Sequence, residues 1–511
     1  MIHTKLSKVI ILPKQWLTII LSSWTLLWMA SGVVKAQNSS YDIDHKYTVQ
    51  ELKEDFNLVR RVLKEAHPGL FWYTSPQMFE QKFDSAYARL NQSMTEAEFY
   101  RFLSPLITLA NCGHTVLDPS LDYQDQGKRF PIDLKFIKGK AYLLYNYSTN
   151  KALKMGVELL EINGQSMKKI VDQLLPMIGS DGENEIFKYS TLEEDFQNYY
   201  EIFIGKPDTF ALKCRDTAGE ILHMKVAASD DPLLRQYHKR SGLEMRTNPL
   251  QYTEIDSLQT AVMTINSFYP NDIKQGGQRF GRYLRRSFKK IHKHEIKNLI
   301  IDLRVNAGGE MLYANDLFSY LYNEPYMFLD RIEVATNKPL DFLKYTNWDK
   351  IDVHDNKYVD AQDSLAKEEV GNFTVKTNFY DFLEVQFPRR KRVFEGKVYI
   401  LIGRKSYSAT CLFSSLMYAN ERATFIGEET GGGAQGLNGG TFLDVTLPHT
   451  YLTLVVPLEK WVRIPQNYPH LKRGIIPQVK ITPTIQDLIQ GNDIVMKETL
   501  KRIAQRKLKQ D

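Results

Sequence analysis

Two segments that lie far apart in the chain could supply the two halves of an acyl-transfer site. The first ends an apolar run with the turn Asn306-Ala-Gly308-Gly309, and the second ends another apolar run with a turn that presents Ser408. A serine placed there can act as a nucleophile, and backbone N–H groups of a glycine turn can stabilise the oxyanion that forms when it attacks a carbonyl. The sequence therefore predicts a nucleophile at Ser408 with an oxyanion hole beside it.

The residues around Ser408 indicate where the oxyanion donors come from. A helix that begins there directs its free N–H groups and the positive end of its dipole at a developing negative charge, so the Ala409 N–H is the first expected donor. The second is expected from Gly308 or Gly309, because a residue without Cβ lets the backbone approach substrate closely. The alternative is that Ser406 or Ser408 only caps the helix.

A nucleophilic serine needs a base, and two regions of the chain carry candidates. The segment Gly427–Gly433 follows the next predicted strand and contains Glu428 and Glu429 but no lysine. His114 lies in a Gly-His-Thr turn at the expected end of a helix. A single histidine is often only structural, so the residues around His114 leave both interpretations open.

The spacing of apolar residues, which indicates the helices and strands that must position these residues, changes along the chain. Capping-box patterns at Thr48–Glu51 and Thr95–Glu98 predict helices within residues 47–110. From Leu258 onward short apolar strands alternate with helices, which predicts an α/β core. The carboxyl ends of such strands meet at one edge of the sheet, where sites of this class lie.

The segment between these two parts is rich in predicted strands. Asn163-Gly164 is a strong signal for a tight turn, and a helical pattern follows it from Met167 to Leu175. Residues Gly156–Gly164 resemble part of a PDZ domain, a fold that can capture a peptide by strand addition. A spacer that holds the helical domain over the site is the equally weighted alternative.

Taken together, the motifs of the chain resemble the C-terminal-processing and tricorn-core serine peptidase family, also called tail-specific proteases. The resemblance extends over essentially the whole chain after its first residues. It rests on His67-Pro-Gly69, Cys112-Gly-His-Thr115, the Asp302–Gly309 segment, Ser408-Ala409, Gly474-Ile-Ile-Pro477, Pro483-Thr484 and Gly491-Asn-Asp493. The early histidine motifs match the tricorn-like branch of that family.

The resemblance implies a crotonase-like β/α spiral for the core, Ser408 as nucleophile, and oxyanion donors at Ala409 and at Gly308 or Gly309. One branch of the family takes its base from a lysine after the nucleophile, and this chain has Gly433 at that position. The tricorn-like branch uses a histidine from an upstream helical domain, which matches His114.

The same branch orients its site with a glutamate late in the chain. Here Leu471-Lys-Arg473 precedes Gly474, and Gln478 stands where the family usually has an aspartate, so neither position offers an acid. Glu428 is therefore the expected orienting carboxylate, with Glu429 as the second choice. Either could instead pair with a nearby base such as Arg422.

These features divide the chain into parts with distinct expected roles. The expected division is residues 1–36 as a signal peptide, 40–125 as a helical domain that carries His114, 126–228 as a PDZ-like domain, 229–257 as a linker, and 258–505 as the peptidase core with an insertion at about 335–390.

The signal-peptide prediction rests on lysines followed by the apolar run Trp16–Val34 and a small-residue cleavage site. We expect an exported protein in the periplasm, at the cell surface or outside the cell, without stable membrane insertion after cleavage; a retained anchor is the alternative. Removing the four lysines of residues 1–36 lowers the formal net charge from +6 to +2, which does not favour nucleic-acid binding. Three cysteines do not make a disulfide framework.

The predicted function is that of an exported serine peptidase. Ser408 would form an acyl-enzyme with a peptide or protein substrate, His114 would act as general base, and Glu428 would orient the site. No organic cofactor and no metal ion is expected, and the oligomeric state is not predicted. The alternative is a non-catalytic ligand-binding protein on the same scaffold, because the family includes retinoid-binding relatives.

Overall fold

The computed structural model describes residues 41–124, 127–230, 248–346, 348–351, 359, 372–389, 391–465 and 468–508. The predicted signal peptide lies outside these ranges, as do parts of the predicted linker and insertion. The residues from Asp42 onward belong to one compact unit. Within the ranges above, no helix combines the length and the apolar character that crossing a bilayer requires.

Three helices follow the short strand β1 (Lys46–Tyr47), which pairs with β2 (Met94–Thr95). They are α1 (Val49–Ala66), α2 (Pro76–Arg89) and α3 (Glu96–Ile107). The capping boxes predicted at Thr48 and Thr95 are both confirmed, with the threonine side chain and the N3 glutamate each accepting from a backbone N–H. Buried aromatic side chains such as Phe56, Phe83 and Phe99 then hold the three helices together.

An antiparallel sheet follows in the order β4-β5-β6-β8-β9, with β7 paired to β6. Its strands are β4 (Ile132–Ile137), β5 (Lys140–Asn146), β6 (Glu158–Ile162), β7 (Gln165–Ser166), β8 (Thr209–Arg215) and β9 (Ile221–Ala227). The predicted tight turn is confirmed, because Asn163 and Gly164 both have positive φ between β6 and β7. The short helix α4 (Leu121–Gln124) precedes this sheet.

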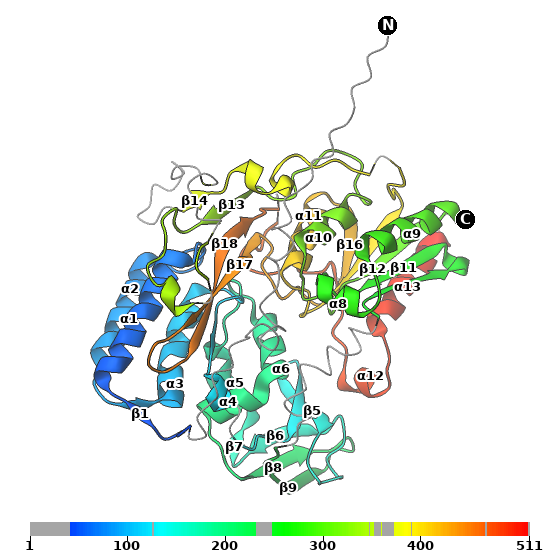
Figure 1. Cartoon of the computed structure of the whole chain (residues 1–511). Coiled ribbons are helices and arrows are strands. Elements are labelled where there is room, and N and C mark those ends of the chain that lie inside the picture. The colour runs from blue at the N-terminus through cyan, green and yellow to red at the C-terminus, as the bar shows by residue number, and fades with distance from the viewer. Residues whose placement is uncertain are drawn as a thin grey trace. The chain divides into compact units, whose positions relative to one another are not determined.

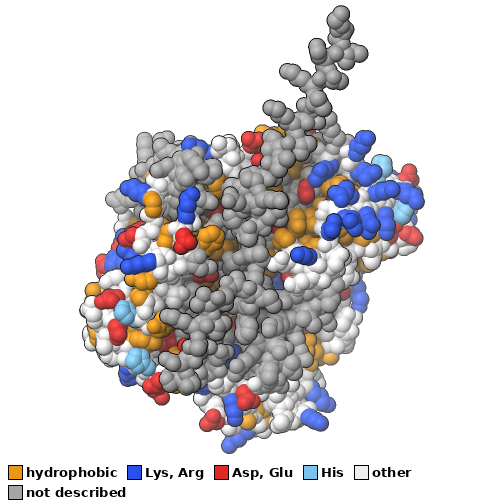
Figure 2. Space-filling view, viewed as in Figure 1, with side chains coloured by type: hydrophobic (Ala, Val, Ile, Leu, Met, Phe, Trp, Pro, Cys, Tyr) orange, Lys and Arg blue, Asp and Glu red, His pale blue; other side chains and the backbone are white. Residues whose placement is uncertain are grey.

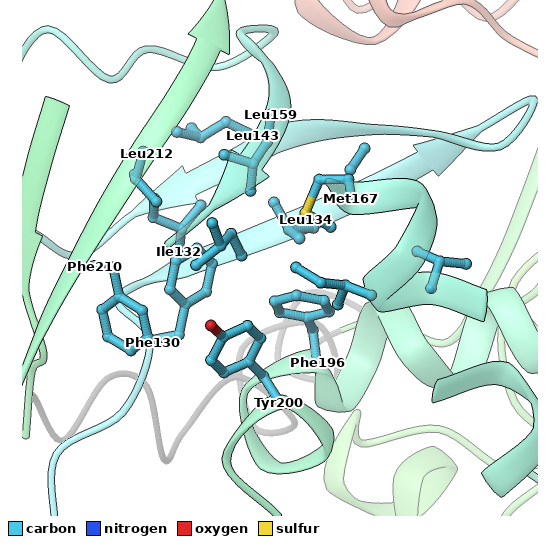
Figure 3. Close-up of a cluster of buried hydrophobic side chains, with 14 of the residues drawn as sticks. Phe130, Ile132, Leu134, Leu143, Leu159, Met167, Phe196, Tyr200, Phe210 and Leu212 are labelled. Atoms are coloured by element: carbon cyan, nitrogen blue, oxygen red, sulfur yellow. The ribbon is translucent and has the colours of Figure 1, made fainter. Parts of the chain in front are cut away.

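Two helices pack against this sheet and complete its core. The helix predicted from Met167 is α5 (Met167–Leu174), while α6 (Glu185–Phe203) was not predicted. Periodicity alone could not indicate α6, because its buried residues include polar side chains as well as apolar ones. Figure 3 shows Phe196 and Tyr200 of α6 meeting Phe130 and Phe210, and these aromatic side chains form the centre of the cluster.

The core sheet that carries the site has the strand order β10-β11-β12-β15-β16-β19. Its strands are β10 (Leu250–Ile255), β11 (Thr260–Ile265), β12 (Asn298–Asp302), β15 (Lys397–Ile402), β16 (Ala423–Gly427) and β19 (Val479–Lys480). All neighbours from β11 to β19 are parallel, and only β10 is antiparallel. The predicted α/β alternation is confirmed, and β12 and β15 end side by side, as parallel register requires.

Helices connect and cover these strands (Figure 1). They are α8 (Pro270–Gln275), α9 (Phe280–Lys293), α10 (Met311–Phe318), α11 (Ala409–Ala419), α12 (Ile485–Ile489) and α13 (Ile494–Lys507). Val495 and Ile503 of α13 pack with apolar residues of β12, β15 and β16. The helix α9 is rich in Lys and Arg, and Figure 2 shows these side chains gathered over it.

A further sheet joins the early part of the chain to its late part. Its order is β14-β13-β18-β17, formed by β13 (Arg331–Val334), β14 (Phe373–Thr374), β17 (Gly436–Thr446) and β18 (Thr453–Val462). The strand β3 (Val116–Asp118) also pairs with β18, and Leu117 faces Leu454 in that ladder. This pairing fixes the segment immediately after His114 against the late part of the chain.

Candidate active site

Ser408 stands on a strained turn between β15 and α11. Its φ of 54° and ψ of −124° place it in a region that residues with a Cβ rarely adopt. Although Ser408 is the N-cap residue of α11, its side chain caps no backbone N–H. A strained serine on a sharp strand-to-helix turn presents its Oγ at the edge of the sheet. The expectation that Ser408 is only a helix cap therefore finds no support in its contacts.

Ser406 has a structural role in the same turn. Its Oγ donates to the Leu303 carbonyl at 2.8 Å and accepts from the Gly403 N–H at 3.1 Å. The side chain thus ties the end of β15 to the turn that follows β12, and it is fully buried. With both of its hydrogen-bonding groups engaged, Ser406 is not a competing nucleophile.

The glycine turn after β12 lies directly against Ser408. A Cβ at Gly308 would come within 2.6 Å of the Ser408 Cβ and 2.9 Å of the Ala409 nitrogen. Gly309 has a φ of 126°, and a Cβ there would lie 2.4 Å from the backbone of Phe268. These contacts and positive φ angles require glycine at both positions. The structure therefore brings together all four residues predicted for the nucleophile and the oxyanion hole.

Asn306 fixes the shape of this turn and separates the roles of the two glycines. Its Oδ1 accepts from the Gly308 N–H at 2.9 Å, and its Nδ2 donates to the Ile265 carbonyl at 3.0 Å. Within the described part of the chain, the N–H groups of Gly309 and Ala409 have no hydrogen-bond acceptor. Of the two glycines, Gly309 is thus the one with an N–H available for substrate.

His114 reaches the same region from the helical end of the chain. The ring is almost completely buried, and its Nδ1 lies 3.0 Å from the hydroxyl of Tyr407, the residue before Ser408. The rings of His114 and Tyr407 are 4.5 Å apart between centroids, and Phe442 of β17 lies on the ring as well. Burial, followed by the influence of His67, lowers the pKa of His114 to about 3. The ring is therefore neutral at physiological pH, as a general base must be.

Ser408 and His114 are linked through Tyr407 and not by a direct hydrogen bond. Among the residues that the structure describes, no hydrogen bond joins Ser408 Oγ to His114. The contact that links the two is the hydroxyl of Tyr407, whose backbone continues directly into Ser408. Catalytic hydrogen bonds in unliganded sites are often long and tighten only when substrate binds.

The glutamates expected to orient the site make other contacts. Glu428 pairs with Arg404, with Oε1 3.0 Å from a guanidinium nitrogen, and Arg404 also pairs with Glu193 of α6. Glu429 pairs with Arg473 and accepts from the Gly474 N–H. In the described ranges neither glutamate forms a hydrogen bond or ion pair with His114, so these interactions give no support to an orienting role. Each glutamate does pair with an arginine, but the arginines are Arg404 and Arg473 rather than Arg422.

Two residues that sequence reasoning missed lie beside His114. Tyr407 supplies the hydroxyl on Nδ1, and Asp181 is a buried carboxylate that accepts from the backbone N–H groups of Gly113 and Gly433. Gly433 is the residue at the position where the other family branch has a lysine. The only local signal for Asp181 was a polar, glycine-containing turn at residues 179–184, which indicates a loop rather than a site.

Three buried side chains near the site have donor atoms of the kind that bind metals. Atoms of Cys112, His114 and Asp181 lie within 4.8 Å of one another. The carboxylate oxygens of Asp181 already accept two backbone N–H groups, and a ring nitrogen of His114 already bonds the Tyr407 hydroxyl. Burial raises the pKa of the Cys112 thiol to about 12. We therefore interpret this cluster as a hydrogen-bonded one and assign no metal to it.

Comparisons with known proteins agree with the arrangement of the core. Residues 259–481 match the model of a family described as peptidase family S41. No curated protein sequence matches the chain. The matched segment contains Gly308, Gly309, Ser408 and Ala409, and His114 lies before it.

Several solved structures share the fold. Mature CPAF complexed with lactacystin has 16% identity and a TM-score of 0.62, over 91% of this chain and 99% of that chain. A CPAF mutant has 15% identity and a TM-score of 0.63, over 89% and 97%. The photosystem II D1 C-terminal processing protease has 12% identity and a TM-score of 0.41, over 84% of this chain and 93% of that chain. At such identities the likeness to CPAF shows a shared mixed α/β fold.

Proposed function

The chain is a serine-type peptidase of family S41, matched over residues 259–481, and from this premise we propose that Ser408 is its nucleophile and His114 its general base. The observation that carries the proposal is the backbone of Ser408. Its strained conformation leaves the side chain free of capping, and Gly308 lies against both the Ser408 Cβ and the Ala409 nitrogen. Strain of this kind persists where the surrounding structure enforces it, and it concentrates at functional sites.

The proposed reaction begins when substrate binds with its scissile carbonyl against Ser408. The hydroxyl proton moves from Oγ to Nε2 of His114 while Oγ bonds to the carbonyl carbon. The resulting oxyanion accepts from the N–H groups of Ala409 and Gly309, because the Gly308 N–H is engaged by Asn306. His114 then gives its proton to the leaving amine, which frees the first product and leaves the acyl-enzyme.

Hydrolysis of the acyl-enzyme repeats these steps with water. His114 takes a proton from the water as it attacks the ester carbonyl, and the same two N–H groups hold the second oxyanion. Collapse of this intermediate returns the proton to Ser408 and releases the acid product. Because burial lowers the pKa of His114 to about 3, the ring is unprotonated at the start of each half-reaction.

The finer architecture is part of the proposal. The parallel sheet with its helices is proposed as a crotonase-like core, and the antiparallel sheet of β4 to β9 with α5 as a PDZ-like domain. We propose a peptide or protein substrate and an exported location, the latter from the apolar N-terminal segment alone. The ion pairs from Arg404 to Glu193 and Glu428 hold the proposed PDZ-like domain to the core next to the nucleophile turn.

Labelling with a fluorophosphonate tests the proposal directly. We expect covalent modification of the intact protein at Ser408, identified by peptide mass spectrometry. Ser408→Ala should abolish this labelling and lower the hydrolysis of a casein substrate by at least ~10⁴-fold. Ser85→Ala, at an exposed serine of α2, is the matched control and should retain both activities. Unchanged hydrolysis in S408A, or labelling at a different serine, would refute the assignment.

A further inference from the structure

Asp181 is a buried acid that joins the two loops around the expected base. Its side chain lies in the segment before α6 and is only 3% exposed. One carboxylate oxygen accepts from the Gly113 N–H at 2.9 Å, and the other accepts from the Gly433 N–H at 3.1 Å. Gly113 precedes His114 in the chain, and Gly433 belongs to the glycine segment after β16. The carboxylate is thereby held close to the His114 ring, with a carboxylate oxygen within 4.8 Å of a ring nitrogen.

The Tyr407 hydroxyl is close to both of these groups. It is 3.0 Å from His114 Nδ1, and it is near enough to the Asp181 carboxylate to help oppose the rise in the pKa of that group. Phe187 stacks on the Tyr407 ring at 4.6 Å, which fixes the plane of the phenol. A Cβ at Gly113 would come within 2.4 Å of the hydroxyl oxygen, so only glycine admits the phenol at this position.

The single hydroxyl proton of Tyr407 can point in either of two directions. If it points at His114, the ring nitrogen Nδ1 accepts it and the ring carries its own proton on Nε2. If it points at Asp181, the phenol oxygen is free to accept, and the ring must donate to it from Nδ1–H. A carboxylate is a much stronger acceptor than a neutral imidazole nitrogen, because the hydrogen bond it accepts is charge-assisted. The second arrangement is therefore the favoured one.

We propose that Asp181 acts through Tyr407 as the orienting acid of the site, holding His114 with its proton on Nδ1 and its Nε2 free to accept the proton of Ser408. This inference rests on the proposed function and deepens it. During attack the Ser408 proton moves to Nε2, while the Nδ1 proton stays on the ring and the phenol proton stays on Tyr407. The carboxylate stabilises the imidazolium through the phenol without itself being protonated, so no proton is gained or lost along the relay.

The contacts of the two glutamates support this assignment. Glu428 and Glu429 are each neutralised by an arginine, whereas Asp181 faces no basic side chain in any contact that the described residues make. The titratable groups that face Asp181 are the phenols of Tyr73 and Tyr407, the thiols of Cys112 and Cys411, and the ring of His114. Burial raises the pKa of all four phenols and thiols well above their ordinary values, so they stay neutral at physiological pH.

The carboxylate is the group of this cluster that changes charge near neutral pH. Burial raises the pKa of Asp181 to about 6, although the N–H groups of Gly113 and Gly433 and the Tyr407 hydroxyl oppose the shift. Protonated Asp181 no longer attracts the phenol proton strongly, so the wrong ring tautomer becomes populated below that pH. The acid limb of kcat/KM should therefore follow Asp181, because His114 itself stays neutral down to a pH of about 3.

The test compares Asp181→Asn and Tyr407→Phe with the wild-type chain between pH 4.5 and 8.5. We expect Y407F to lower kcat by ~10²- to 10⁴-fold with KM little changed, because the tautomer is no longer enforced. We expect D181N to lower kcat at pH 7.5 and to remove the acid limb near pH 6. If D181N fails to fold by circular dichroism, Y407F alone decides, since it removes one hydroxyl and keeps the packing of the ring.

Asp55→Asn is the matched control for loss of a buried carboxylate. Asp55 is also fully buried, also accepts two backbone N–H groups and also has a raised pKa, but it lies on α1 and pairs with the turn at Thr450. D55N should keep the acid limb near pH 6. Wild-type kcat and an unchanged limb in D181N and Y407F would overturn the relay. If the wild-type chain shows no fluorophosphonate labelling at Ser408, the proposed function itself fails, and the two failures are thus distinguishable.

Discussion

The strain at Ser408 predicts that the site destabilises the chain, and a pair of substitutions can measure the effect. Ser408→Ala and Ser408→Gly both remove the nucleophile, so neither should hydrolyse peptides. They differ in what they do to the backbone at φ 54° and ψ −124°. Alanine keeps the strain because it retains a Cβ, whereas glycine relieves it. No cap is lost in either variant, because the Ser408 side chain makes no capping hydrogen bond.

The size of the difference follows from two opposing contributions. A residue with a Cβ in such a sparsely populated region costs about 1 to 3 kcal/mol. Glycine loses about 0.5 to 1 kcal/mol more conformational entropy on folding than alanine does. The balance leaves S408G about 1 kcal/mol more stable than S408A, which corresponds to about 2 to 4 °C in Tm for a unit of the size of the core.

Thermal unfolding of the two variants by calorimetry under identical conditions is the assay. Ser85 supplies a control pair in the exposed face of α2, where the backbone is helical. There Ser85→Gly should be less stable than Ser85→Ala by about 1 kcal/mol, because glycine is a poor helix former. The sign of the glycine effect should thus reverse between the two positions. If S408G is no more stable than S408A, the backbone at Ser408 is not strained and the argument from it fails.

Three further predictions follow from the contacts of the site. Glu428→Gln should lower kcat by less than about tenfold, because Glu428 pairs with Arg404, whereas an orienting acid would cost about 10⁴-fold; steady-state kinetics decides. Asn306→Ala should lower kcat, and it should lower the free energy of unfolding measured in urea by about 1 to 3 kcal/mol, because the buried Ile265 carbonyl loses its hydrogen-bond donor. An unchanged kcat would show that the glycine turn keeps its shape without Asn306. Burial lowers the pKa of His67 from 6.5 to about 3. Between these pH values the His67 ring binds a proton in the unfolded chain but not in the native chain, so the free energy of unfolding falls as the pH drops from 6.5 toward 3. His67→Gln should flatten that decline in unfolding experiments at pH 4.5, 5.5 and 7, and an equal slope in both proteins would contradict it.

Much of the site could be predicted because its parts are local patterns. The ends of β12 and β15 are visible as apolar runs that stop at glycine or serine, and parallel pairing then places Gly308 beside Ser408. The helices around His114 begin at capping boxes that need only four residues to recognise. The family resemblance is confirmed by the match of residues 259–481, and the role of His114 stays a prediction.

The parts that sequence reasoning missed depend on contacts between distant segments. Asp181 meets Gly113 and Gly433 only after three separate loops have come together, and no local pattern encodes that meeting. The sequence did not indicate that Glu428 pairs with Arg404, because Arg404 lies in a separate turn, the one before Ser408. The strand β10 lies within the segment that was expected to be a linker. Its sequence did not indicate a strand, because β10 is at the half-exposed edge of the sheet, where polar residues alternate with apolar ones.

The pairing of β3 with β18 also sets the order in which the chain can become active. A nascent chain that has emerged as far as residue 400 already contains His114, but it has neither the partner strand of β3 nor Ser408. Pairing between segments so far apart in sequence forms late, because loop closure must precede it. Proteolytic competence therefore arrives only when synthesis and folding of the whole chain are nearly complete. With the proposed roles of His114 as base and Ser408 as nucleophile, a chain that is still being made cannot cleave its neighbours.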